Sequence, residues 1–215
     1  MKKNIAIDGP AGAGKSTVAK KIAERLGLLY VDTGAMYRAI ALKAKNEKIN
    51  LSSEKDVTEL AGRTEVELKG DRVFLNGKDV SREIRSPEIS TISSAVSRFG
   101  GVRRRLVEIQ RKLSKSAGVI MEGRDIGTVV LPDADFKFYL DASVKERAMR
   151  RLKELTAKGI EADFKQVEDE IRKRDEQDTG REIAPLKKAE DAIVIDSSNL
   201  TAEQVIGEIL RHVGV

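Results

Sequence analysis

Short apolar runs and segments with helical spacing alternate along the first forty residues of the chain. The run from Lys3 to Ile7 is rich in β-branched residues, which predicts a buried strand. After a glycine-rich stretch, apolar residues recur along one helical face, at Val18, Ala19, Ile22, Ala23 and Leu26. Gly27 is a good helix stop, and a second apolar run, Leu28–Val31, follows it. Strand, helix and strand in this order are typical of a parallel α/β sheet.

The same alternation returns in the second half of the chain. Further apolar runs predict strands at 118–121, 136–140 and 192–195. Spacing and capping signals predict helices at 33–45, from 53, 87–97, 102–117, from a Ser143/Glu146 capping box, 163–178, and from a Thr201/Gln204 capping box. We expect a single domain, residues 1–215, with a central parallel sheet flanked by helices.

Residues 63–84 have a different pattern. Three short alternating segments predict strands at 65–68, 72–75 and 78–80, with Gly70-Asp71 and Asn76-Gly77 as the turns between them. We predict a small antiparallel insert here. It is too small to fold alone, so we expect it to pack over the substrate side of the domain.

Composition excludes several classes of protein. The 215 residues are 40% hydrophobic and 35% charged, and no apolar run is long enough to predict a membrane span. The segment MKKNIAIDG enters the first strand directly, so we do not expect a signal peptide. Cysteine is absent and His212 is the only histidine, so catalysis is expected to use lysine, arginine, aspartate and hydroxyl groups. The net charge of +5 favours anionic partners, while 4% aromatic residues and no tryptophan disfavour nucleic acid.

The glycine-rich stretch carries the most specific chemical signal. GPAGAGKST, residues 9–17, matches the phosphate-binding pattern G-x-x-x-x-G-K-[ST] at every fixed position. Backbone N–H groups of such a loop can wrap a polyphosphate, and the start of the following helix adds partial positive charge. Lys15 is predicted to reach the β- and γ-phosphates and Ser16 to ligate Mg²⁺. A glycine turn that binds nothing is the alternative, which the flanking strand and helix disfavour. The predicted ATP-binding residues are Gly9, Pro10, Ala11, Gly12, Ala13, Gly14, Lys15, Ser16 and Thr17.

Polar and cationic residues follow three further strands, at 32–38, 122–125 and 141–151. The carboxyl ends of parallel strands meet at one edge of the sheet, where α/β proteins bind ligands. Thr33 could cap the next helix or bind an anion, and Arg38 lies about one turn later. One phosphate loop plus several arginines indicates more phosphate than one nucleotide carries. This favours a kinase whose acceptor is itself phosphorylated.

Three charged clusters on predicted helices each allow two interpretations. Arg103–Arg105 is typical of a solvated face, although one member could point at a phosphate or a base. Arg147, Arg150 and Arg151 would suit a lid over a polyphosphate. The residues Arg174, Asp178 and Arg181 share one helical face, either as a salt-bridge ladder or as part of a site.

The chain as a whole resembles the bacterial cytidylate kinases, which phosphorylate CMP and dCMP with ATP. The resemblance is carried by IDGPAGAGKST at 7–17, DTGAMYR at 32–38, GRDIGTVV at 123–130, LDAS at 140–143, and RDEQDTGR with APL within 174–186. It implies a P-loop NTPase three-layer fold with a central parallel sheet flanked by helices, the small antiparallel β insert and a short helical lid. Residues 36–98 would bind the nucleoside monophosphate and 147–162 would form the lid.

The resemblance also implies roles for individual residues. The catalytic group would be Lys15, Arg124, Arg147 and Arg151. The acceptor-binding group would be Thr33, Arg38, Ser94, Arg103, Arg124, Asp125, Arg174, Asp178 and Arg181. Within it, Arg38 and Arg124 look like the clamp on the acceptor phosphate, and Asp178 like the contact to the ribose. The cytosine ring would be recognised by Ser94, Arg103 and Asp125.

The implied reaction is direct transfer of the γ-phosphoryl group to the phosphate of CMP, with Mg²⁺ as the metal. It needs no covalent intermediate and no strong base, because the acceptor phosphate is already anionic. We expect a cytoplasmic monomer that binds ATP and CMP or dCMP but neither nucleic acid nor membrane. Another P-loop kinase, acting on AMP, UMP or shikimate, is the nearest alternative. A nucleotide-dependent regulatory or RNA-binding protein is a second alternative, which the few aromatic residues disfavour.

Overall fold

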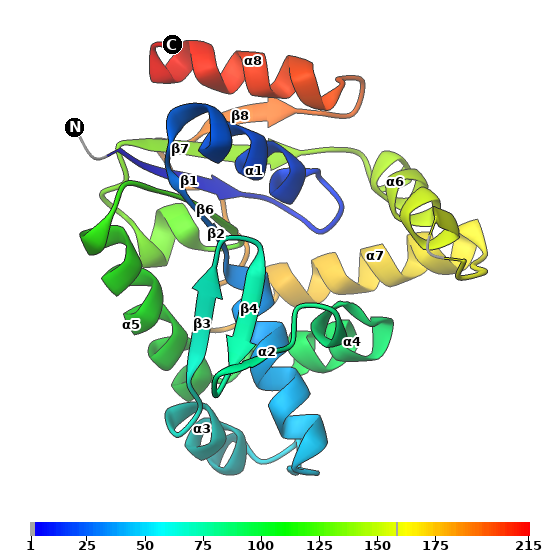
Figure 1. Ribbon diagram of the computed structural model, residues 1–215. Coiled ribbons are helices and arrows are strands. Elements are labelled where there is room, and N and C mark those ends of the chain that lie inside the picture. The colour runs from blue at the N-terminus through cyan, green and yellow to red at the C-terminus, as the bar shows by residue number, and fades with distance from the viewer. Residues whose placement is uncertain (1–2, 158) are drawn as a thin grey trace. The chain divides into compact units, whose positions relative to one another are not determined.

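The chain divides into two units in the structure, a computed structural model that describes residues 3–157 and 159–215 (Figure 1). One unit contains residues 3–28 and 120–215, and the other contains 29–119. The predicted single domain, 1–215, also includes Met1 and Lys2, and the predicted lid, 147–162, includes Lys158. These three residues lie outside the described part of the chain.

The unit of 3–28 and 120–215 is built on parallel strands in the order β6-β1-β7-β8. Ile7 of β1 lies opposite Phe138 of β7, and Phe138 lies opposite Ile193 of β8. The elements are β1 (Asn4–Asp8), α1 (Lys15–Leu26), β6 (Val119–Gly123), the π-helical turn η2 (Ile126–Val130), β7 (Phe136–Asp141), α6 (Val144–Ala157), α7 (Phe164–Thr179), β8 (Ile193–Asp196) and α8 (Ala202–Val213).

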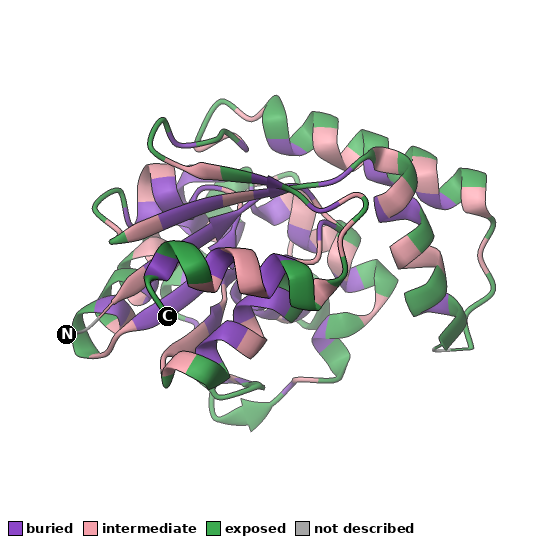
Figure 2. Cartoon of the chain, turned by 90° about the horizontal axis from the view of Figure 1, so that it is seen from above, coloured by how far each residue is buried: buried purple, intermediate pink, exposed green. Residues whose placement is uncertain are grey.

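The strands of this sheet are its most buried part, as the purple ribbon in Figure 2 shows. Ile5, Ala6 and Ile7 of β1 are fully buried, which explains why the sequence there is continuously apolar. Two predicted helix boundaries are confirmed. Gly27 ends α1 in the left-handed conformation, and Thr201 begins α8 with a complete capping box.

The predicted capping box at Ser143 is only half present. The Ser143 hydroxyl accepts the Glu146 N–H at 3.2 Å, but the Ser143 N–H donates to the hydroxyl of Ser198 at 2.9 Å. The start of α6 is therefore tied to the loop after β8. Helices α6 and α7 also share a hydrophobic cluster of their own, made by Ala148, Leu155, Val167 and Ile171.

The unit of residues 29–119 combines helices with a three-stranded antiparallel sheet, β3-β4-β5. Val66 lies opposite Leu75, and Asn76 and Gly77 turn the chain with positive φ, as the hairpin signal predicts. Before this sheet, the Leu29 N–H donates to the carbonyl of Gly118, directly ahead of β6. The elements are β2 (Leu29–Asp32), α2 (Thr33–Asn46), α3 (Glu54–Gly62), β3 (Val66–Lys69), β4 (Arg72–Leu75), β5 (Lys78–Asp79), η1 (Glu83–Arg85), α4 (Pro87–Val96) and α5 (Gly100–Ser116).

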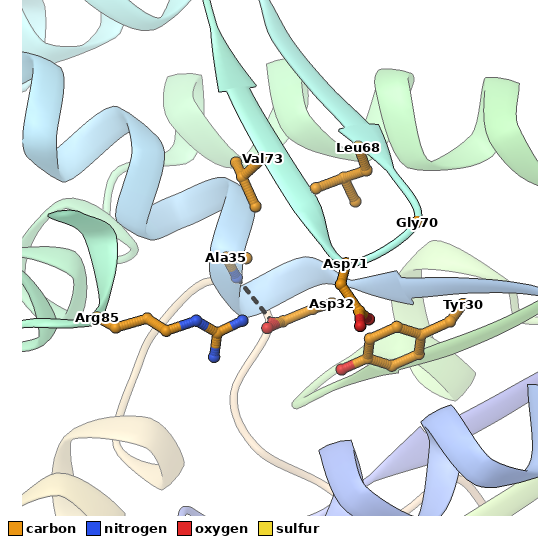
Figure 3. A pocket seen from close by; sticks show the side chains of 8 residues that line it. All are labelled: Tyr30, Asp32, Ala35, Leu68, Gly70, Asp71, Val73 and Arg85. Atoms are coloured by element: carbon orange, nitrogen blue, oxygen red, sulfur yellow. Dashed lines mark hydrogen bonds between the residues drawn. The ribbon is translucent and has the colours of Figure 1, made fainter. Parts of the chain in front are cut away.

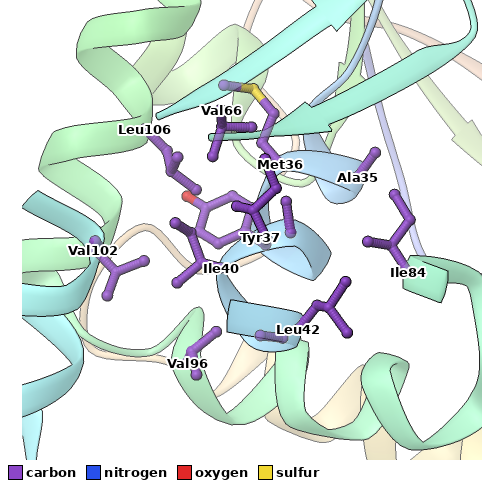
Figure 4. Close-up of a cluster of buried hydrophobic side chains, with 14 of the residues drawn as sticks. Ala35, Met36, Tyr37, Ile40, Leu42, Val66, Ile84, Val96, Val102 and Leu106 are labelled. Carbon is purple, nitrogen blue, oxygen red and sulfur yellow. The ribbon is translucent and has the colours of Figure 1, made fainter. Parts of the chain in front are cut away.

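Helix α2 lies at the centre of this second unit. Its buried residues Met36, Tyr37 and Ile40 pack among side chains from the insert and from α5, including Val66 and Leu106 (Figure 4). The apolar face of the insert is thus covered by the helix that carries Arg38. None of the helices in the described ranges is long and apolar enough to cross a bilayer.

The contact between α3 and α5 predicts opposite effects for two glycine-to-alanine substitutions. A Cβ at Gly101 would lie 2.2–2.8 Å from side-chain atoms of Thr58, whereas one at Gly207 in α8 would meet nothing within 4 Å. We expect Gly101→Ala to lower the free energy of unfolding by about 1–3 kcal/mol through overpacking. Gly207→Ala should raise it by about 0.5–1 kcal/mol, because alanine favours a helix interior. Urea denaturation measures both values, and a gain in stability from Gly101→Ala would contradict the close contact.

Candidate active site

The loop between β1 and α1 leaves a helix start open to a ligand. Helices α2, α7 and α8 begin with a side chain that accepts a backbone N–H, but α1 begins at Gly14 without one. Its N–H groups can therefore serve an anion. Gly9 has a φ of 145°, and a Cβ there would lie 2.0 Å from the carbonyl oxygen of Leu140. The loop thus packs directly against β7, which only glycine permits.

Lys15 is a buried cation at the base of this loop. The residue is 5% exposed, and its Nζ donates to the carbonyl of Pro10 at 2.7 Å. Burial, and next the charge of Arg124, lower the pKa of Lys15 to about 7, against the opposing carboxylates of Glu122, Asp8 and Asp178. A bound polyphosphate would favour the charged ammonium, so Lys15 is poised to take up a proton when an anion arrives.

Ser16 is bonded to a carboxylate whose role the sequence did not predict. The Ser16 hydroxyl donates to Glu122 Oε1 at 2.5 Å, which places an acidic group from the end of β6 beside the predicted metal ligand. Hydroxyl and carboxylate oxygens are donors that Mg²⁺ prefers. Within 3–157 and 159–215, no three acidic or histidine side chains form a metal cluster. A cation at Ser16 and Glu122 would take most of its ligands from water and phosphate, as Mg²⁺ often does.

Asp178 forms ion pairs with two of the predicted phosphate-binding arginines. Its Oδ2 accepts from Arg124 Nε at 2.7 Å, and its Oδ1 lies 3.4 Å from Arg181 Nη2. Burial would raise the pKa of Asp178, but Arg124 and then Arg181 hold it below the usual value. Burial alone would also lower the pKa of Arg124, and the Asp178 charge reverses that effect. Asp178 therefore holds both arginines, and the charge of Arg124 acts on Lys15.

The prediction that Arg174, Asp178 and Arg181 share one helical face is wrong for Arg181. Helix α7 ends at Thr179, and Gly180 is its C-cap, so Arg181 lies beyond the helix. Arg181 still reaches Asp178 because its Nε donates back to the Asp178 carbonyl at 3.3 Å. The contact arises from the turn after the helix and not from helical spacing.

Arg147 holds the phosphate loop through a hydrogen bond to its backbone. It is 3% exposed and donates to the carbonyl of Ala11 at 3.1 Å, while Asp175 of α7 holds the guanidinium at 3.0 and 2.6 Å. Arg151, its predicted partner in the lid, forms a partly exposed pair with Glu154 at 2.9 Å.

Arg150, which was predicted as part of the lid cluster but not as an individual site residue, contacts the phosphate loop through Ser197. It donates to the hydroxyl of Ser197 at 3.1 Å, and that hydroxyl lies 3.2 Å from the carbonyl of Ala13 in the loop. Since Arg150 and Arg151 are adjacent in the sequence, spacing could not distinguish the one that contacts this network.

Asp8, at the end of β1, is a second buried group that the sequence did not single out. Its carboxylate accepts the N–H groups of Ile126 and Gly127 at 2.8 and 2.7 Å. Burial raises the pKa of Asp8 to about 6 against the lowering effect of these two hydrogen bonds. Asp125, the residue before them, is 5% exposed.

In the unit of 29–119, one carboxylate organises the start of α2. Asp32, and not Thr33, caps the helix, accepting the Ala35 N–H at 2.8 Å through Oδ1. Its other oxygen pairs with Arg38 Nη2 at 2.9 Å. A Cβ at Gly34 would lie 3.1 Å from Arg38 Nη1, so glycine makes room for the guanidinium. Thr33 is the buried first residue of the helix.

The structure distinguishes among the three arginines at 103–105. Arg103 is 4% exposed, donates to the carbonyl of Ser97 at 3.0 Å and stacks 5.4 Å above the ring of Tyr37. Arg104 is exposed, as the alternative interpretation expects. Ser94 lies half-buried on α4, and its carbonyl accepts the Ser97 hydroxyl at 2.9 Å. Ser94, Arg103 and the residue before Arg38 therefore belong to one packed region of this unit.

A small cavity lies between the insert and the start of α2 (Figure 3). It has a volume of about 20 Å³ and is lined in part by Tyr30, Asp32 and Asp71. In Figure 3 the Arg85 guanidinium points toward Asp32. The cavity has room for about one water molecule and none for a nucleotide.

Known proteins resemble this chain over almost all of its length. A family profile described as "Cytidylate kinase" matches residues 5–214. A cytidylate kinase from Caldanaerobacter subterraneus subsp. tengcongensis is 56% identical over 209 residues, covering 97% of this chain and 93% of that protein. One from Caldicellulosiruptor saccharolyticus is 53% identical, covering 98% and 96%.

Solved structures agree on the fold. Shikimate kinase from Bacteroides thetaiotaomicron has a TM-score of 0.51 at 10% identity and covers 99% of both chains. Shikimate kinase from Acinetobacter baumannii has a TM-score of 0.50 at 16% identity, covering 98% of this chain and 92% of that one. At these identities the likeness concerns the fold alone, and it confirms the predicted P-loop kinase architecture.

The lowered pKa of Lys15 predicts that ATP binding takes up a proton. Lys15, with a pKa of about 7, is mostly neutral at pH 8, and a bound polyphosphate should restore its charge. We expect an uptake of about one proton at pH 8, which calorimetry in buffers of different ionisation enthalpy would measure. Lys15→Arg is the matched control, because arginine stays charged and should show no uptake. Equal uptake by both proteins would contradict the assignment to Lys15.

Proposed function

Because the chain belongs to the cytidylate kinase family, we propose that it transfers the γ-phosphoryl group of ATP to CMP. The full-length likeness to cytidylate kinases is the observation that carries the proposal. The arrangement of charge supports it: Lys15 lies at the base of a phosphate loop, Arg124 acts on its charge, and Asp178 holds Arg124 and Arg181 together. Such an excess of buried positive charge suits two phosphorylated substrates.

The donor nucleotide would be held mainly by backbone. The free N–H groups at the start of α1 and the ammonium of Lys15 would bind the β- and γ-phosphates of ATP. To do so, Lys15 exchanges its hydrogen bond with Pro10 for one with phosphate. Arg147, fixed by Asp175, keeps the loop at Ala11 in place, so little reorganisation is needed when ATP binds.

The acceptor would be held by side chains. Arg38 and Arg124 would bind the CMP phosphate, each oriented by a carboxylate, Asp32 or Asp178. Ser94, Arg103 and Asp125 would recognise the cytosine, and Asp178 the ribose. With both phosphates aligned, a CMP phosphate oxygen displaces ADP from the γ-phosphorus in line. The attacking oxygen is already anionic, so no side chain needs to remove a proton.

Ser16 and Glu122 would hold the divalent cation, which we propose to be Mg²⁺. Their oxygens, 2.5 Å apart, present the donor chemistry that this metal prefers. When bound, the cation neutralises charge on the β- and γ-phosphates. The Ser16 hydroxyl would then exchange its hydrogen bond with Glu122 for the metal.

Some finer expectations stay predictions. They are the use of dCMP, the monomeric state, the cytoplasmic location, the acceptor-binding region 36–98 and the lid 147–162 with Arg151 and Arg174 in ligand contact. The fold likeness to shikimate kinases does not favour a shikimate acceptor, because it is a likeness of fold alone. Assaying CMP, dCMP, UMP, AMP and shikimate with ATP and Mg²⁺ tests the proposal, and we expect the highest kcat/KM with CMP.

Lys15→Ala should abolish turnover and leave CMP binding intact. The substitution removes the cation that faces the transferred phosphoryl group, so kcat should fall at least about a hundredfold. The Kd of CMP, measured by calorimetry, should change less than about twofold, because CMP binds through other residues. Lys55→Ala, on an exposed position of α3, is the control and should behave like the wild type. Retained turnover in Lys15→Ala would overturn the assignment of the phosphate loop.

Asp125→Ala should weaken the choice of CMP over UMP. A buried carboxylate can accept a hydrogen bond from the amino group of cytosine, and uracil has a carbonyl oxygen at that position. We expect the ratio of kcat/KM for CMP to that for UMP to fall about tenfold or more. The exposed Asp133→Ala is the control. An unchanged ratio in Asp125→Ala would refute the role.

A further inference from the structure

A buried carboxylate joins two distant segments of the 3–28 and 120–215 unit. Asp8 is 4% exposed at the end of β1, and each of its oxygens accepts one backbone N–H. Oδ1 accepts from Ile126 at 2.8 Å and Oδ2 from Gly127 at 2.7 Å. The charge of Asp8 is one of those that oppose the lowered pKa of Lys15. The transfer mechanism gives no role to its two hydrogen bonds.

The two N–H groups are the first donors of the π-helical turn η2. In this turn the Val130 N–H donates to the carbonyl of Asp125 at 3.1 Å, and Leu131 to that of Ile126 at 2.7 Å. The donors at its start have no partner within the turn, and Asp125 does not cap them with its side chain. Asp8 therefore acts as the cap of η2 from a strand 118 positions earlier in the chain.

Close packing keeps this cap in one position. A Cβ at Gly127 would lie 3.5 Å from Asp8 Oδ2 and 3.2 Å from Cδ of Lys137. The carboxylate thus packs directly beneath the backbone of Gly127. The Lys137 ammonium does not compete for Asp8, because it pairs with Asp191 at 2.8 Å.

The capped turn directly follows Arg124 and Asp125. Asp125 has an irregular backbone, with φ −142° and ψ 25°, so its side-chain direction depends on how the next residue is held. We propose that Asp8 is a positioning residue for acceptor recognition, whose two oxygens fix the start of η2 and so aim Asp125 and Arg124 at the nucleotide. The inference rests on the proposed function of those two residues.

The chemistry of the contact requires the ionised carboxylate. Two N–H donors need two acceptors, which a carboxylate supplies, whereas a carboxylic acid or an amide supplies one acceptor and a donor. Burial raises the pKa of Asp8 most and the two N–H groups lower it; after these effects, the charge of Asp125 raises it and that of Lys15 lowers it. Arg124 and Tyr139 also interact electrostatically with Asp8. The pKa of Asp8 is about 6 in the folded protein, above its ordinary value of 3.8, so the folded state favours the protonated form. This contribution to the free energy of unfolding is fully present below the unfolded pKa and is lost as the pH rises through 6. Its ionised form therefore disfavours folding, in agreement with a role in function rather than in stability.

The test compares Asp8→Asn with Asp135→Asn at pH 8. The control residue is exposed at the other end of β1, where its carboxylate likewise accepts one backbone N–H, that of Asn4 at 2.7 Å. For Asp8→Asn we expect the KM for CMP to rise about tenfold and the CMP-to-UMP ratio of kcat/KM to fall. The KM for ATP should rise several-fold less, through the lost charge of Asp8 at Lys15. Asp135→Asn should match the wild type in all three values.

The pH profile gives a readout that a merely structural contact would not move. The ratio of kcat/KM for CMP between wild type and Asp8→Asn should be largest at pH 8 and approach one near pH 5, where Asp8 is protonated. Ionisation of CMP itself cancels in this ratio, because both proteins use the same substrate. A ratio that stays constant from pH 5 to pH 8 would overturn the proposal.

A second variant decides the matter if Asp8→Asn does not fold. A Cβ at Gly127 would lie in ordinary contact with Asp8 Oδ2, at 3.5 Å, and 3.2 Å from Lys137 Cδ, so the larger side chain of Gly127→Val must displace the carboxylate from the start of η2 while leaving its charge in place. We expect Gly127→Val to show the same rise in the KM for CMP with an unchanged KM for ATP. Equal losses toward both substrates in a folded variant, or none, would refute the positioning role. A wild-type protein that does not phosphorylate CMP would instead refute the proposed function, so the two failures are distinguishable.

Discussion

Buried charge around Lys15 is the constraint on which the donor half of the site depends. The Lys15 side chain is 5% exposed, and burial and Arg124 lower its pKa. The carboxylates of Glu122, Asp8 and Asp178 oppose this effect, so the pKa falls only to about 7. This balance would be unfavourable in a protein that bound nothing, since desolvated charges cost stability. A polyphosphate would supply negative charge, so the site already has the electrostatic form that such a ligand requires.

Carboxylates orient cations throughout both units. Asp178 holds Arg124, Asp175 holds Arg147, and Asp32 holds Arg38. In each pair the aspartate lies at the start of a helix or in its last turns. Guanidinium groups fixed in this way lose little entropy when a phosphate binds. Asp8 is a related case, because its carboxylate accepts hydrogen bonds from two backbone N–H groups instead of from an arginine side chain.

Much of the fold and part of the site could be predicted from the sequence. The phosphate loop, the antiparallel insert and the helix start at Thr201 depend on neighbouring residues, so local spacing indicated them. The cap at Asp32 was missed in favour of Thr33, because both residue types cap helices and only the backbone distinguishes them. Arg181 was placed on a helical face, but the helix ends two residues earlier, at Thr179.

The sequence by itself determined the chemistry that is available: a loop that can wrap phosphate, arginines in excess, and no cysteine to act as a nucleophile. Tertiary structure alone decided which of these groups act together. Glu122 reaches Ser16 across 106 positions, and Asp8 reaches Gly127 across 119, because β1 and β6 are neighbours in the sheet. Among the arginines at 103–105, packing against Tyr37 selected Arg103 for burial. Periodicity along the chain predicts which face of an element is buried, but it does not predict which distant element covers that face.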